Sequence, residues 1–159
     1  MAKRLSMLSM LTAIGLLAAW LEYMLLPPIA VPGVKIGLAN LATVAALYLY
    51  GFRDASAVTF ARVALAALLF GNLSTLMFAL AGALLAVPGM ALLKRVAGFS
   101  PVGVSIAGGV LHNAGQLLAA AVIAKTPGLA AYLPVLLVSG AAMGAVNGVI
   151  ALAVIRRFR

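Results

Sequence analysis

The sequence has no cysteine and almost no acid: its 159 residues include one aspartate, one glutamate and one histidine. Without cysteine the chain forms no disulfide and no thiolate metal site. Mg²⁺ is held chiefly by carboxylates, and two of them on separate segments make a poor metal site. We therefore expect neither a metal nor another cofactor. The scarcity of charge also argues against a soluble domain, because 8% of the residues are charged where about 25% is usual.

What the chain has instead is apolar surface. Hydrophobic residues make up 66% of it, and the mean hydropathy is +1.24. No globular core could hide so much apolar surface, so the solvent must be lipid. The net charge of +9 would suggest nucleic acid in a soluble protein, but here the basic residues separate apolar runs. No basic and aromatic surface is left to bind a duplex, and we expect no nucleic-acid partner.

The apolar residues fall into six runs of about the length that spans a bilayer. The runs are apolar on all faces, which favours helices over the alternating strands of a β-barrel. We therefore predict one all-α transmembrane domain over residues 1–159, a bundle of six helices in the lipid bilayer. The predicted spans are Leu5–Leu26, Val34–Gly51, Ala55–Phe70, Leu73–Leu93, Val102–Ala124 and Leu129–Ile155.

The basic residues between the runs predict the orientation, because cytoplasmic loops carry an excess of Lys and Arg. With both termini in the cytoplasm, only Lys35 and Lys125 face the outside. Arg62 lies within the third run. We therefore expect a multi-pass protein of the cell (inner, cytoplasmic) membrane. The basic residues on the inside are then Lys3, Arg4, Arg53, Lys94, Arg95, Arg156, Arg157 and Arg159.

Arg62 is the polar residue that most needs an explanation. It lies near the middle of its span, where an arginine costs at least about 2.5–3.5 kcal/mol to insert. Its only candidate counter-ions in the protein are Glu22 and Asp54. If Glu22 pairs with Lys35 instead, the missing anion is a ligand.

Other polar residues fall in the outer half of the same bundle and predict one cationic, hydrogen-bonding pocket open to the outside. Structural alternatives stay open: Lys35 could reach the headgroups, Glu22 could form a salt bridge with Lys35, and asparagines, Asn147 included, could link helices. The predicted substrate-binding residues are Lys35, Arg62, His112, Asn113 and Gln116, with Asn40 and Asn72 at the edge and Glu22 near Lys35.

Three stretches resemble a known bacterial family. They are "PGVKIGLAN" at 32–40, "ARVALAALLFGNLS" at 61–74 and "HNAGQ" at 112–116. The family is called Gx transporters or heptaprenyl diphosphate synthase component I. It is in turn similar to the six-helix substrate-binding S components of energy-coupling factor (ECF) transporters. The two names imply different chemistry.

The transporter name implies a subunit that captures a small molecule from outside, such as a vitamin or an isoprenoid or quinone precursor. Such a subunit associates with an ECF coupling subunit and two ATPases. Small residues of the first helix dock on the coupling subunit in those proteins. Here Ser9, Ala13, Gly15 and Ala19 could serve, although the alanine pattern is interrupted by Leu17.

The synthase name implies prenyl transfer, for which the two acids are too few to hold the Mg²⁺ ions. The chain also has no phosphate-binding loop for ATP. We therefore expect no enzyme activity. A non-catalytic accessory subunit of prenyl diphosphate or quinone biosynthesis, or of another membrane complex, is the alternative function.

Overall fold

The computed structural model describes residues 2–25, 37–96 and 98–158, and all its elements within these ranges are helical. The prediction of an all-helical membrane bundle is confirmed. The elements are α1 (Ala2–Leu25), α2 (Asn40–Leu49), α3 (Phe52–Phe70), α4 (Leu73–Leu93), α5 (Pro101–Ile123), the 3₁₀ helix η1 (Pro127–Tyr132) and α6 (Leu133–Phe158).

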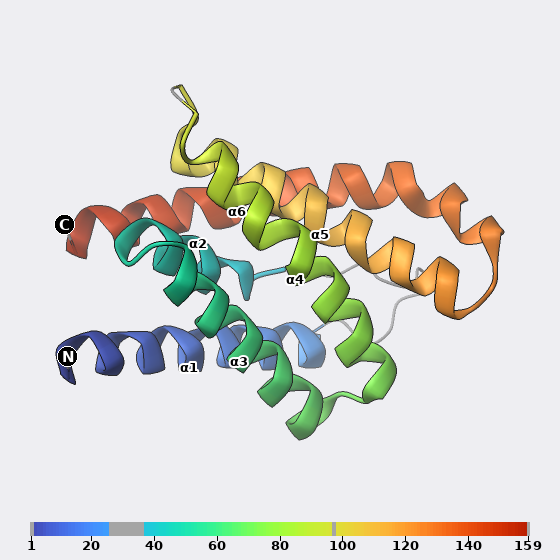
Figure 1. The fold of residues 1–159 in the computed structure, drawn as a ribbon, viewed down its shortest axis with the longest axis horizontal. Coiled ribbons are helices and arrows are strands. Elements are labelled where there is room, and N and C mark those ends of the chain that lie inside the picture. The colour runs from blue at the N-terminus through green and yellow to red at the C-terminus, as the bar shows by residue number, and fades with distance from the viewer. Residues whose placement is uncertain (1, 26–36, 97, 159) are drawn as a thin grey trace.

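Helices α1, α5 and α6 run roughly along the long axis of the bundle, and α3 and α4 cross it obliquely (Figure 1). Both marked chain ends lie at the same end of the bundle, which we call the terminal end. Helices α1, α3 and α5 run away from the terminal end, and α4 and α6 return to it. The other end of the bundle is the distal end. Within the described chain, α1, α4, α5 and the stretch Gly128–Phe158 are long and apolar enough to cross a membrane.

The second predicted span, Val34–Gly51, differs from the structure. The described helix begins only at Asn40, and Gly37–Ala39 form a turn before it. Ten residues rise about 15 Å, roughly half of a bilayer core of about 30 Å. Residues 34–36 lie outside the described ranges. Helix α2 is therefore a half-length helix that starts partway along the bundle, as Figure 1 also shows.

Helix starts follow from local capping. Asn72 accepts a hydrogen bond from the Thr75 N–H, and the Thr75 hydroxyl accepts one from the Asn72 N–H, which is a capping box for α4. Ser100 accepts from the Gly103 N–H, and Pro101 follows at the first helical position of α5. These caps explain why α4 and α5 begin within a residue of the predicted spans.

Glycines bring α5 and α6 close together. A Cβ on Gly109 would collide with the Gly140 carbonyl, and one on Gly144 would lie 2.6 Å from the backbone carbonyl oxygen of Ser105. Gly148 faces Val102 in the same way. Gly140, Gly144 and Gly148 are spaced by four along one face of α6, the small-xxx-small pattern of membrane helix contacts.

The apolar core lies in the half of the bundle next to the terminal end. The largest share of its members comes from α2, and the others come from the middle of α1, the first part of α3, the last part of α4 and α6, and the start of α5. Glu22, Arg62 and Gln116 are buried further toward the distal end. Buried polar groups are thus found in both halves, because Asp54 and Ser105 are also buried, near the terminal end. Core residues include Leu11, Val58, Met90, Val104 and Ile155.

Candidate functional site

Arg62 is buried in the middle of α3, with 7% of its surface exposed. Its Nε–H has no hydrogen-bond partner among the described residues. The only ion pair between two described residues joins Arg4 to Asp54, at 2.6 Å. The Glu22 carboxylate is near enough to attract the guanidinium electrostatically but does not form an ion pair with it. Because no described carboxylate forms an ion pair with this buried cation, and a buried cation is costly unless it is paired, the position is a candidate site for a ligand or for water.

The stem of Arg62 lies against the start of α2. At Gly15, on α1, an added Cβ would lie 2.6 Å from Cδ of Arg62 and 3.0 Å from Cβ of Ala42, with the Ala39 carbonyl also in contact. Gly15 thus provides the space in which the arginine side chain crosses between α1, α2 and α3. Ala39, at the N-cap of α2, offers no side-chain cap. The guanidinium of Arg62 and the positive N-terminal end of the α2 dipole therefore both make the electrostatic potential in this region more positive.

The backbone before α2 is held by side chains from two other helices. The Gly37 N–H donates to Oε1 of Glu22 at 2.7 Å, and the Gly37 carbonyl accepts from Nδ2 of Asn147 at 2.7 Å. Gly37 has φ +72°, a conformation that glycine adopts without strain. Non-helical backbone inside a membrane bundle needs such partners. Glu22 and Asn147 are both buried and supply them.

The predicted set His112, Asn113 and Gln116 is divided between two faces of α5. Gln116 Nε2 and His112 Nε2 are hydrogen-bonded at 3.1 Å, and the His112 ring lies against Gly82 of α4. Gln116 Oε1 is buried without a partner among the described residues. Asn113 instead donates to the Leu136 carbonyl at 2.8 Å, toward α6. Asn113 therefore links helices and does not belong with the other two.

Three further residues of the predicted pocket remain, and each has its own position: Asn72, Asn40 and Lys35. Asn72 is exposed and caps α4, so its side chain is accounted for by the capping box. Asn40 is half-buried at the start of α2, close to Gly37, to whose carbonyl its N–H donates. Lys35 lies outside the described residues. Of the predicted set, Arg62, Glu22 and Asn40 gather around the start of α2, and His112 and Gln116 form a second polar pair on α5.

The predicted docking residues of α1 do not share one face. Ser9 and Ala13 are exposed, whereas Gly15 is buried and Ala19 is half-buried. Gly15 packs inside the bundle against Arg62, on another face than Ser9 and Ala13, and the docking role of this set stays a prediction. The reason for the two faces is helical periodicity: positions 9 and 13 share a face, and position 15 is about 140° away from the midpoint of that face at 100° per residue.

Two features of the interior were missed by sequence reasoning. Asn147 was interpreted only as a helix link, although it holds the turn before α2. Thr43 and Thr59 share a hydrogen bond of 2.7 Å between α2 and α3. A lone asparagine in an apolar run signals a buried partner, but the sequence does not say which one.

Among the described residues, no three potential metal ligands cluster.

Four long apolar helices and a buried polar region define a multi-pass helical membrane protein. The chain belongs to the family described as heptaprenyl diphosphate synthase component I, whose family model matches residues 11–154. No curated protein and no solved structure gives a significant match to the chain. The resemblance predicted from the three motifs is thereby confirmed at the level of the family.

Proposed function

We propose that the protein is a substrate-binding membrane subunit that holds a small anionic organic molecule beside Arg62. The observation that carries this is the buried guanidinium, which forms no ion pair with a described carboxylate, at the start of a half-length helix. Interrupted helices place their N-termini at anionic groups in many membrane transporters. An anion here would interact with both the guanidinium and the α2 dipole.

A non-catalytic role is part of this proposal. Asp54 is bonded to Arg4, and Arg4 and Glu22 lie eighteen residues apart on α1. At a rise of about 1.5 Å per residue this is about 27 Å, too far for the two carboxylates to hold one Mg²⁺ cluster. The chain would therefore bind and deliver a molecule without transforming it.

The membrane arrangement belongs to the proposal as well. Six spans, with the terminal end in the cytoplasm, agree with the seven described basic residues at that end against Lys125 at the distal end. The half of the bundle that holds Glu22, Arg62 and Gln116 would then face the outside of the cell membrane. Helix α1 packs on α2 and α3 and leaves Ser9 and Ala13 exposed. An ECF-type coupling subunit with two ATPases would dock on that face.

The test compares two arginines of the same helix. Arg62→Met removes the buried charge, and Arg53→Met removes an exposed one. Both proteins would be purified from their own host, and native mass spectrometry would give the fraction that carries a co-purified anionic molecule. We expect Arg62→Met to fold and to lose affinity by about 2 kcal/mol or more, roughly 30-fold, because one partner of a desolvated charge pair is gone. Arg53→Met should keep the molecule. Unfolding of Arg62→Met with unchanged occupancy per folded molecule would make the arginine structural.

The family description favours a second candidate, an accessory subunit of prenyl diphosphate synthesis. The two candidates differ in one measurable property. A substrate-binding subunit shows saturable binding of a small anion that depends on Arg62. An accessory subunit shows none, and instead changes the activity of a separate catalytic subunit when the two are mixed.

A further inference from the structure

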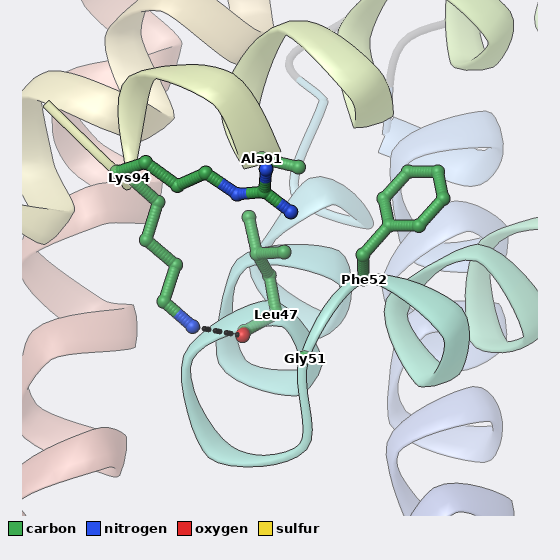
Figure 2. Close-up of a pocket in the computed structure, with 6 residues that line it drawn as sticks. Leu47, Gly51, Phe52, Ala91 and Lys94 are labelled. Carbon is green, nitrogen blue, oxygen red and sulfur yellow. Dashed lines mark hydrogen bonds between the residues drawn. The ribbon is translucent and has the colours of Figure 1, made fainter.

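A second site lies at the terminal end, away from Arg62. A surface pocket of about 250 Å³ opens where α2 and α4 end and α3 begins. Figure 2 shows its apolar walls, Leu47, Phe52 and Ala91, around the Gly51 backbone, with Lys94 beside them. Arg95 completes the lining. Apolar spans give way to charged residues at this level, which is where lipid headgroups lie.

The Lys94 ammonium is positioned by two contacts. Nζ donates to the Leu47 carbonyl at 2.7 Å, the dashed line in Figure 2, and lies 4.9 Å from the centre of the Tyr48 ring. A lysine at the last carbonyls of a helix is favoured by the helix dipole. These contacts order the long side chain, so its charge is fixed at the pocket and not spread over the surface.

The described acid nearest in the fold to this end is held by a basic residue outside the pocket lining. Asp54 is the one acid at the terminal end, and its carboxylate is bonded to Nε and Nη2 of Arg4. Arg95 is exposed and forms no ion pair with a described carboxylate. With a net charge of +9 and two acids in the whole sequence, the protein is strongly basic, which favours an anionic partner at this pocket.

We propose that this pocket binds the phosphate-bearing anionic headgroup of an amphiphile in the leaflet at the terminal end. Lys94 and Arg95 would contact the phosphate oxygens, and Leu47, Phe52 and Ala91 the first carbons of the tail. Basic pockets between membrane helices bind such headgroups. The volume is below the 300–1,000 Å³ of drug-sized sites, which suits one headgroup. A phospholipid and an isoprenoid diphosphate share this chemistry.

The experiment measures retained amphiphile by native mass spectrometry of the full chain in detergent. The probes are phosphatidylglycerol, farnesyl diphosphate and, as the neutral headgroup, phosphatidylcholine. Arg95→Gln removes a pocket charge. Ala91→Leu fills the pocket and leaves every charge in place. Arg156→Gln is the matched control, because Arg156 is an exposed basic residue at the same end that does not line the pocket.

We expect one anionic probe to be retained over phosphatidylcholine, and the preferred probe identifies the source. Arg95→Gln should weaken retention about fivefold, the scale for one basic residue at an anionic surface. Ala91→Leu should also weaken retention, because the larger side chain occupies the pocket. Arg156→Gln should leave retention unchanged. If Arg156→Gln weakens retention as much as Arg95→Gln, the basic residues attract anionic lipid without a specific site, and the proposal is overturned. Equal retention of anionic and neutral headgroups would overturn it as well. If Ala91→Leu does not fold, the two charge variants decide the question alone.

Discussion

The backbone carbonyl of Gly37 accepts a hydrogen bond from Nδ2 of Asn147, 110 residues further along the chain, at 2.7 Å. This contact joins the turn before α2 to the middle of α6. The N–H of the same glycine is bonded to Glu22 of α1. A single residue of non-helical backbone is thus tied to the first and the last helix of the bundle.

Replacing Asn147 tests this link. Asn147→Leu removes the donor but keeps a side chain of similar volume. We expect the free energy of unfolding to fall by about 1 kcal/mol, the net value of one hydrogen bond, since the Gly37 carbonyl keeps the Asn40 N–H as a donor. Thermal unfolding in detergent measures the change. Asn40→Ala, at a half-buried position nearby, is the comparison and should change stability by less than about 0.5 kcal/mol. An equal loss of stability in the two variants would show that the hydrogen bond between Asn147 and Gly37 does not stabilise the protein.

Two replacements of Glu22 separate its hydrogen bond from its charge. Glu22→Gln keeps an oxygen that can accept from the Gly37 N–H, whereas Glu22→Leu leaves that donor without its acceptor. We expect Glu22→Leu to lower the free energy of unfolding by about 1–3 kcal/mol and Glu22→Gln by clearly less. Unfolding curves of the two variants in the same detergent provide the measurement. If both lose the same stability, the charge of Glu22 matters and the hydrogen bond does not.

The α5–α6 contact depends on the absence of a side chain at Gly144. A Cβ there would lie 2.6 Å from both the Ile106 Cα and the Ser105 carbonyl oxygen, and backbone atoms cannot move aside cheaply. We expect Gly144→Ala to lower the free energy of unfolding by about 1–3 kcal/mol, the usual range for overpacking. Gly128→Ala is the matched control, because a Cβ on Gly128 meets nothing within 4 Å. A Gly144→Ala protein as stable as that control would contradict the close approach.

The orientation is tested with single cysteines, because the chain has none of its own. One replaces Arg95, between α4 and α5 at the terminal end, and one replaces Thr126, between α5 and η1 at the distal end. We expect a membrane-impermeant maleimide applied to intact cells to label position 126 at once and position 95 only after permeabilisation. Labelling of position 95 from outside would place the terminal end outside the cell and refute the orientation.

Composition and run length were enough to predict a helical membrane bundle, and the helices begin and end close to the predicted spans at α1, α4 and α5. These features depend on local properties: hydropathy over about twenty residues, and caps such as Asn72 with Thr75. The three motifs also indicated the family. Arg62 stood out because a charge in the middle of a span is costly wherever it points.

Which polar groups meet was decided only by the tertiary structure. Neighbouring residues of a helix point about 100° apart, so His112 and Asn113 face α4 and α6 separately, although the sequence places them side by side. Gly15 was grouped with surface residues, but its face of α1 packs on Arg62. The half-length α2 depends on Glu22 and Asn147 from distant helices to satisfy its broken backbone. Hydropathy describes how apolar a stretch is, and only packing in three dimensions determines which partner each buried polar group finds.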